Sequence, residues 1–393
     1  MMNFIFIRGK IETLSFFSEQ LAKELSDLGY HTYIHGFYAD AKELKKHFHG
    51  HETVFITFNC IGISGEAEYM ASDNTSLWRA GNIRIVNILV DHPIYYHDQL
   101  SRLEIYGTAK EDYFVICIDR YHLKYFKKYY PEAVHSDFLP LAGSGSEYAC
   151  QSGRKKYDII FTGNFTPCGH FEKYIERNGA EYSAFYHGII DDLLCHTEKP
   201  IEDVCISHII KEIPDATDAD IRQVMNNMIF IDLYVRFYIR EKIIREIINA
   251  GFNLRLVGKG FEAIKPSNKK ALSQTALMPT AYCLKETACS KISLNVMPWF
   301  RDGCHDRILS AMLCGALSLT DGSIWLSENF TDMTDICFYD PNRTDKLISK
   351  LHYLTDNPDI LESISAAGHQ KALKAHTWKS RAARIANLLE PVK

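Results

Sequence analysis

The stretch that decides the predicted fold is KISLNVMPWFRDGCHDRILSAMLCGALSLTD, from Lys291 to Asp321. Residues 291–296 are mostly apolar and are soon followed by Pro298, which predicts a buried strand that ends in a loop. The residues after this loop carry apolar side chains at helical spacing until Gly315, a typical C-terminal cap, and a second apolar run follows. This order of strand, helix and strand is the crossover from which open parallel sheets are built.

Two basic residues, His305 and Arg307, lie at the start of the predicted helix. A helix start favours acidic side chains, because its free N–H groups and its dipole are positive. Basic residues at this position therefore indicate a bound anion, and a phosphate held by helix N–H groups and an arginine is the simplest candidate. The alternative is structural: Arg307 pairs with Asp302 or Asp306, and His305 is a packed polar residue.

The length and composition are those of a globular protein with more than one domain. A chain of 393 residues is long for a single core, so two domains are expected. The net charge of −5 and the lack of a long Lys/Arg run argue against a nucleic-acid partner. No stretch is apolar enough for a membrane span, and the first apolar run is too short for a signal peptide.

The eleven cysteines are an odd number and are scattered through predicted strands and helices. This pattern favours reduced, buried thiols and a cytoplasmic location over a disulfide framework. Cys195, His196, Cys205 and His208 have the side chains of a zinc site, but their spacing matches no familiar zinc motif. No bound metal is therefore expected.

Residues 1–145 predict a Rossmann-like α/β domain, in which apolar strands alternate with helices. One predicted strand, residues 83–90, runs directly into Asp91 and His92. These side chains would lie at the carboxyl edge of the sheet, where ligands of such sheets bind. Either could act as a general base on a bound hydroxyl, although Asp before His-Pro is also ordinary turn chemistry.

Residues 146–375 predict a second Rossmann-like domain, with a helical insertion at about residues 167–250. The apolar stretch at 219–250 predicts a long helix. Its stripe of apolar side chains is most simply explained by packing in the core or by a contact between domains. Residues 376–393 predict an amphipathic helix that crosses back to the N-terminal domain.

Two predicted strand ends in this second domain carry glycine. The strand at 157–162 ends at Gly163 and Asn164, and the strand at 253–257 ends at Gly258 and Lys259. Glycine allows backbone N–H groups to approach a phosphate, and Lys259 would neutralise its charge. A plain solvated turn is the alternative at Gly258 and Lys259.

Several segments of the second half resemble, in sequence and in succession, the C-terminal domain of GT-B glycosyltransferases: DIIFTGN, LRLVGKG, KISLNVMPW, DGCHDRILSAMLCGALSLTD, ICFYDP and HTWKSR. In particular they resemble the spore-maturation CgeB-like family, with its family-1-type transferase domain. The first half, with NILVDHP, FVICIDR and FLPLA, is similar to the N-terminal domain that accompanies it.

The resemblance implies a GT-B fold, in which two Rossmann-like domains face each other across a cleft. It implies transfer of a sugar from a nucleotide sugar, with UDP as the expected nucleotide, to a hydroxyl of a glycan or protein acceptor. GT-B enzymes generally need no bound metal, and no other cofactor is expected.

The resemblance also implies roles for individual residues. The equivalent helix of the wider group usually carries two glutamates in an E-x7-E arrangement, for the donor sugar and the ribose. Asp302 and Ser310 occupy these positions here, and Ser310 would bind a ribose hydroxyl less strongly than a carboxylate. The catalytic residues would be His305 and Arg307 at the diphosphate, and Asp91 and His92 on the acceptor side. The donor site would comprise Gly163, Asn164, Gly258, Lys259, Asp302, Ser310, Gly315 and Asp321.

Other functions are compatible with the same sequence. A nucleotide-sugar epimerase or a glycoside phosphorylase would keep the fold and change the reaction. A non-catalytic nucleotide-sugar-binding protein also remains open, because the second glutamate is missing. The sugar, the acceptor, the stereochemical outcome and the oligomeric state do not follow from the sequence.

Overall fold

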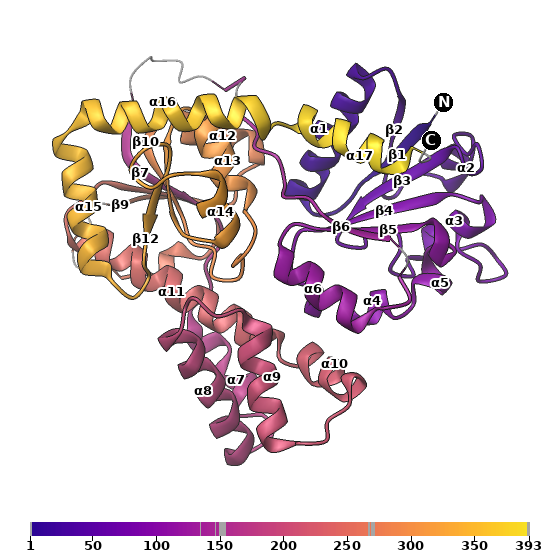
Figure 1. Cartoon of the computed structure of the whole chain (residues 1–393), viewed down its shortest axis with the longest axis horizontal. Helices are drawn as coiled ribbons and strands as arrows, with labels where there is room; N and C mark the ends of the chain where they lie inside the picture. The colour runs from indigo at the N-terminus through magenta and orange to yellow at the C-terminus, as the bar shows by residue number, and fades with distance from the viewer. Residues whose placement is uncertain are drawn as a thin grey trace. The chain divides into compact units, whose positions relative to one another are not determined.

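The computed structural model describes residues 2–133, 135–145, 147–148, 155–265, 268 and 272–390. The chain forms two compact units (Figure 1). The first comprises Met1–Ala142 and Thr377–Lys393, and the second comprises Gly143–His376. The domain boundary predicted at residue 146 lies outside the described residues.

The first unit is built on a parallel sheet of six strands, in the order β2-β1-β3-β4-β5-β6. Its central strands are buried on both faces, as expected of a parallel sheet covered by helices. The strands are β1 (Asn3–Arg8), β2 (His31–Gly36), β3 (Thr53–Phe58), β4 (Arg84–Leu89), β5 (Tyr113–Cys117) and β6 (His135–Phe138). The helices are α1 (Glu12–Asp27), α2 (Ala41–Lys45), α3 (Leu77–Ala80), α4 (His97–Leu100), α5 (Leu103–Tyr106) and α6 (Arg120–Tyr129), with a 3-10 turn η2 (Pro93–Tyr96).

The last helix of the chain, α17 (Trp378–Leu389), belongs to this first unit, where it lies beside α1 (Figure 1). The Trp378 ring lies 5.4 Å from the ring of Phe17 on α1. The buried Arg381 donates a 2.6 Å hydrogen bond from Nε to the carbonyl oxygen of Pro140. The C-terminal helix therefore completes the core of the N-terminal sheet.

The second unit has its own parallel sheet of six strands, in the order β12-β11-β10-β7-β8-β9. Counted from its first strand, this order is 6-5-4-1-2-3, the order of the dinucleotide-binding Rossmann fold. The strands are β7 (Tyr157–Thr162), β8 (Leu254–Val257), β9 (Leu272–Thr275), β10 (Ser290–Asn295), β11 (Leu317–Asp321) and β12 (Cys337–Tyr339). The helices outside the insertion are α12 (Thr280–Ala288), α13 (Asp306–Leu313), α14 (Ile324–Asn329), α15 (Thr344–Asp356) and α16 (Pro358–Ala375).

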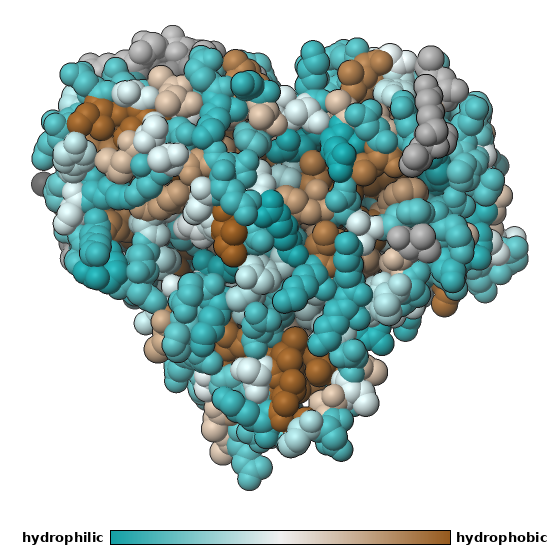
Figure 2. All heavy atoms as spheres, in the orientation of Figure 1, coloured by the Kyte–Doolittle hydropathy of each residue, from teal (hydrophilic) through white to brown (hydrophobic). Residues whose placement is uncertain are grey.

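A helical insertion separates β7 from β8. Its helices are α7 (Glu172–Ile175), α8 (Ala180–Cys195), α9 (Ile201–Glu212), α10 (Asp218–Asn226) and α11 (Ile229–Asn249). The single long helix predicted at 219–250 is wrong in one respect, because the chain breaks at Asn227 and Met228 between α10 and α11. Figure 2 shows a hydrophobic strip over α9, the helix that carries Ile210, 45% exposed.

The predicted fold class is confirmed: both units are Rossmann-like, and the second contains a helical insertion. Two strands were not predicted, β6 and β9, and both lie at a sheet edge. No helix in the described part of the chain is long and apolar enough to cross a membrane.

Candidate functional site

The strand order of the second unit marks where a ligand would bind. The chain leaves β7 toward β8 on one side, and it leaves β10 toward β11 on the other, although β7 and β10 are neighbours. In open α/β sheets, ligands occupy the crevice outside the carboxyl ends of the strands at such a switch point. The residues after β7 and the loop before α13 therefore frame the candidate site.

Two glycines allow the ends of β7 and β8 to approach each other closely. Gly163 and Gly258 have φ values of +154° and +146°. A Cβ atom on Gly258 would lie 1.7 Å from the carbonyl oxygen of Gly163, and one on Gly163 would lie 2.8 Å from Nη1 of Arg307. Any side chain at either position would occupy the space of the backbone or of the guanidinium.

Arg307 reaches from the first turn of α13 to the end of β7. Its Nη1 donates a 2.6 Å hydrogen bond to the carbonyl oxygen of Thr162, and its Nη2 lies 3.1 Å from Nε2 of His305. Nδ1 of His305 lies 2.7 Å from Oδ1 of Asp306. Nδ1 of His305 also lies 3.3 Å from the backbone nitrogen and from Nε of Arg307, so it either donates to Asp306 or accepts from Arg307 as the cap of α13. His305 therefore orients Arg307, and Asp306 orients His305.

Two further arginines come from α11, in the insertion, and were not predicted as site residues. Arg240 is 6% exposed and donates from Nη1 to the carbonyl oxygen of Asn164, next to Gly163. Its guanidinium lies 5.1 Å from the centre of the Phe161 ring, and that of Arg307 lies 5.6 Å from the same ring. One turn earlier on α11, Arg236 makes a bidentate ion pair with the buried Asp232. The sequence feature that could have identified these two residues is the spacing of four between two arginines in an otherwise apolar helix.

The electrostatics of these arginines favour an anion. Burial lowers the pKa of Arg240 well below its ordinary value, and Arg307 and Arg236 lower it further. Burial also lowers the pKa of Arg307, against the opposing effect of Asp306. Within the described part of the chain, Arg240 has no carboxylate partner, and its Nε has no hydrogen-bond acceptor. A buried cation without a counterion is costly, so a negative ligand would stabilise this arrangement.

The structure brings several of the predicted donor residues together at this edge. Asn164 follows Gly163, and its Oδ1 lies 3.3 Å from the backbone nitrogen of Lys259, which follows Gly258. Asp321 ends β11 with 1% of its surface exposed, and its Oδ1 accepts a 2.8 Å hydrogen bond from the nitrogen of Met297. Burial raises the pKa of Asp321, and the nearby Arg301 counteracts this effect.

Other predicted donor residues lie elsewhere on or beside α13. Ser310 is buried and its Oγ accepts a 3.0 Å hydrogen bond from the nitrogen of Ser144. Gly315 follows the C-terminal end of α13, and its carbonyl oxygen accepts from Lys155, at 2.7 Å. At a rise of about 1.5 Å per residue, Gly315 lies roughly 12 Å along the helix from Arg307. Asp302 is half-buried in the loop before α13.

Asp91 and His92 follow β4 in the first unit and have different surroundings. Asp91 is half-buried, and its Oδ2 accepts hydrogen bonds from Nδ2 of Asn59 at 2.9 Å and from the hydroxyl of Tyr96 at 3.2 Å. His92 is 3% exposed, and its Nδ1 accepts from the nitrogen of Ile94. Its side chain therefore caps η2, the structural role that the sequence left open.

The buried His92 leads to a prediction about stability and pH. Burial lowers the pKa of His92 to about 3, against an ordinary value of about 6.5. Between these values the unfolded chain binds a proton that the folded chain excludes, so stability falls as the pH is lowered through this window. We expect His92→Asn, which can still cap the turn, to weaken this loss, by up to about 1.4 kcal/mol per pH unit.

Thermal unfolding between pH 6.5 and 4.5 measures the effect of His92→Asn against wild type. His31→Gln is the matched control, because His31 is exposed. Equal pH slopes for wild type and His92→Asn would contradict the prediction.

The histidines and cysteines of the insertion do not form a metal cluster. Asp192 accepts from His196 at 2.7 Å and lies 3.3 Å from Nε2 of His208, while Cys205 is buried and Cys195 is exposed. No group of three or more potential metal ligands occurs among the described residues. These side chains instead connect α8 with α9 through an ion-pair network.

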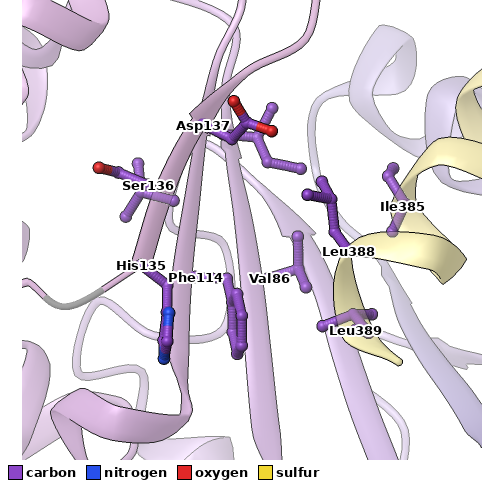
Figure 3. A pocket seen from close by; sticks show the side chains of 10 residues that line it. Val86, Phe114, His135, Ser136, Asp137, Ile385, Leu388 and Leu389 are labelled. Carbon is purple, nitrogen blue, oxygen red and sulfur yellow. The ribbon is translucent and has the colours of Figure 1, made fainter. Parts of the chain in front are cut away.

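Each unit also contains a cavity. In the first unit, a cavity of about 290 Å³ lies where Val86 and Phe114 of the sheet face Leu388 and Leu389 of α17 (Figure 3). Its lining is mainly apolar, which does not suit a diphosphate. In the second unit, a cavity of about 600 Å³ lies at the carboxyl ends of β11 and β12. It is lined by Thr197, Glu198, Arg301, Asp321, Gly322, Ser323, Ile324, Ser327, Glu328, Asp340 and Pro341.

Part of the chain matches a known protein family. Residues 239–387, which run from α11 through α17, match the family described as glycosyl transferase-like. The match includes Arg240, the loop after β8 and all of α13. No curated protein sequence matches the chain.

Solved glycosyltransferase structures share the fold over almost the whole chain. Sucrose-phosphate synthase from Thermosynechococcus elongatus is 9% identical, with a TM-score of 0.56 over 99% of this chain and 98% of that chain. HepE from Anabaena, in complex with UDP-glucose, is 12% identical, with a TM-score of 0.54 over 99% of each chain. The β-glucosyltransferase of phage T4 is 12% identical, with a TM-score of 0.54 over 100% of each chain. The fold is GT-B.

Proposed function

We propose that this protein is a glycosyltransferase that moves a sugar from a nucleotide sugar, with UDP as the nucleotide, to a hydroxyl acceptor. The observation that carries the proposal is the convergence of Arg240 and Arg307 at the end of β7, at the switch point of a Rossmann sheet. The glycosyl transferase-like match and the GT-B fold support it. HepE and the phage enzyme have structures with UDP-glucose, which makes a UDP-sugar the first donor to test.

The proposed reaction requires stabilisation of a departing diphosphate. Arg307 and Arg240 would face the charge that develops on this leaving group, and the first N–H groups of α13 would add a positive dipole. His305 would hold the guanidinium group of Arg307 in place through the 3.1 Å contact of its Nε2 with Nη2. Because the arginines are already fixed and largely desolvated, little reorganisation is needed when the bond breaks.

The cavity beside Arg301 and Asp321 is the proposed site of the donor sugar. Its carboxylates and hydroxyls, from Glu198, Glu328 and Ser323 among others, are the groups that hydrogen-bond sugar hydroxyls. Thr197 and Glu198 belong to the connection between α8 and α9, so the insertion contributes one wall. The insertion would thus take part in donor selection.

The acceptor would be a glycan or protein hydroxyl bound on the first unit, with Asp91 as its general base. His92, as a buried cap, would support the turn that carries Asp91. We also propose that the protein is related to the CgeB-like family, that it is located in the cytoplasm and that its reaction needs no bound metal.

A thermal-shift screen across nucleotide sugars tests the proposed function. A ligand that binds only the folded state stabilises it by about 2.7 kcal/mol at one hundred times its Kd. We expect UDP and a UDP-sugar to raise the melting temperature, and we expect Arg240→Met to abolish most of this shift. Arg245→Met is the control, because Arg245 lies on the same helix but pairs with Glu241.

Two outcomes would argue against the proposal. If no nucleotide sugar shifts the melting temperature, the anion site has another ligand. If a donor is converted to a different nucleotide sugar in the absence of any acceptor, as NMR of the sugar would reveal, the protein is an epimerase.

A further inference from the structure

The carboxylate of Asp91 is held in one orientation. Both hydrogen bonds described above reach Oδ2, from Asn59 and from Tyr96. No hydrogen bond from the described residues reaches Oδ1, and the side chain is half-buried. One oxygen is therefore fixed, while the other is available to a ligand.

Asn59 is itself fixed by the surrounding backbone. Its Oδ1 accepts a 2.8 Å hydrogen bond from the nitrogen of Val90, and its own nitrogen donates to the carbonyl oxygen of Ile88 at 3.0 Å. Asn59 and Cys60 have φ values of 52° and 61°, a left-handed conformation that is unfavourable for two consecutive non-glycine residues. Such a conformation persists only where the surrounding structure enforces it, and it is concentrated at functional sites.

A buried polar group in the sheet enforces this conformation. Asn87 lies in the middle of β4 and is fully buried. Its Oδ1 accepts from the nitrogen of Cys60 at 3.1 Å, and its Nδ2 lies 3.1 Å from Sγ of Cys60 and 2.7 Å from the hydroxyl of Tyr113. An asparagine in a buried strand is costly unless its amide is satisfied. Here it is satisfied by the turn that presents Asn59 to Asp91.

We propose that Asn59 and Tyr96 are positioning residues for Asp91, and that Asp91 is the general base of a transfer that inverts the anomeric configuration. This inference rests on the proposed glycosyltransferase function. The acceptor oxygen would form a bond to the anomeric carbon while the bond from that carbon to the diphosphate oxygen breaks. The hydroxyl proton would pass to Oδ1 of Asp91, and the bonding electron pair would leave with the diphosphate. A single displacement of this kind requires a base on the acceptor side and inverts the carbon.

The histidine, thiol and phenol side chains around Asp91 are neutral near neutral pH, whereas Glu66, which accepts hydrogen bonds from the nitrogens of Gly62 and Ser64, is a further carboxylate of this region. Burial holds the pKa of His92 at about 3, raises that of the Cys60 thiol to about 12 and raises that of Tyr96 above its usual range. Tyr95, a phenol, is the remaining titratable neighbour on η2.

The first test is the pH profile of donor turnover, measured as UDP release from UDP-glucose with water as acceptor. We expect Asp91→Asn to lose about 10²- to 10⁴-fold in rate. Asn59→Gly keeps the left-handed backbone accessible and removes only the amide, and Tyr96→Phe removes only the hydroxyl. Each should slow turnover and move the acidic limb to higher pH by on the order of one unit, because the carboxylate loses one donor.

The matched control is Asn82→Gly. Asn82 is also an asparagine in the left-handed conformation, with φ of 52°, but its side chain is exposed and it lies before β4. It should leave the pH profile unchanged. If the acidic limb of the pH profile is unchanged in both Asn59→Gly and Tyr96→Phe, these residues do not position Asp91. A purely structural role would lower the stability of the variants without moving this limb.

The second test is the configuration of the first product, read by proton NMR before mutarotation. UDP-glucose has an α-linked sugar, so inversion gives β-glucose first. Release of α-glucose first would overturn the inference while leaving the glycosyltransferase function intact. If wild type turns over neither UDP-glucose nor the nucleotide sugar selected by thermal shift, the proposed function and this inference both fail.

Discussion

Arg307→Ala is expected to lower the rate of sugar transfer by about 10²- to 10³-fold, the usual loss when one group aimed at a developing negative charge is removed. Arg307 is expected to have this effect because its guanidinium bridges from α13 to the carbonyl oxygen of Thr162 at the switch point. Donor turnover, with UDP release as the readout, measures the loss. The effect should fall mainly on kcat, because the charge on the diphosphate grows in the transition state.

Two variants make this result specific. Arg307→Lys keeps the positive charge but loses the fork that contacts both Thr162 and His305, so it should recover only part of the rate. Arg245→Ala removes an arginine from α11 that pairs with Glu241, and it should leave turnover unchanged. Wild-type turnover by Arg307→Ala would exclude the phosphate role for this residue.

Gly258→Ala is expected to destabilise the second unit strongly. The new Cβ atom would lie 1.7 Å from the carbonyl oxygen of Gly163, and the backbone φ of +146° is itself unfavourable for alanine. Strain and overpacking each cost about 1–3 kcal/mol, so we expect a loss on the order of 3 kcal/mol. In a unit of this size that corresponds to a fall in melting temperature of roughly 6–12 °C.

The same substitution should weaken donor binding, since Gly163 lies between the two carbonyl groups that Arg307 and Arg240 contact, those of Thr162 and Asn164. Gly169→Ala is the control, because a Cβ atom added at Gly169 would have no atom within 4 Å and the φ of this residue is not positive. Differential scanning calorimetry, with and without UDP, separates the two effects. If Gly258→Ala had the same melting temperature as Gly169→Ala, the prediction would be wrong, because the ends of β7 and β8 would then separate without a loss of stability.

Most of the fold could be predicted because its central strands have a strong sequence signal. Strands buried on both faces give nearly continuous apolar runs, such as that of β3, and the strand predicted at 157–162 coincides with β7. The strands β6 and β9, HSDF and LSQT, are polar edge strands and give no such run. The break between α10 and α11 was also missed, because the apolar pattern continues across it.

The candidate site could be predicted only where its residues are close to a motif. Arg307 and His305 were found because they lie at a helix start, and Gly163 and Gly258 because they end strands. Their roles in donor binding stay predictions. Arg240 was missed because its helix has the pattern of ordinary core packing, and nothing local indicates that its guanidinium reaches Asn164.

The sequence by itself determined the two Rossmann-like units, the insertion and the positive start of α13, because these depend on local periodicity and helix electrostatics. Only the tertiary structure decided which charges converge. The bonds that bring Arg307 to Thr162 and Arg240 to Asn164 join residues 145 and 76 positions apart. Such contacts depend on strand order and helix packing, which no local pattern encodes.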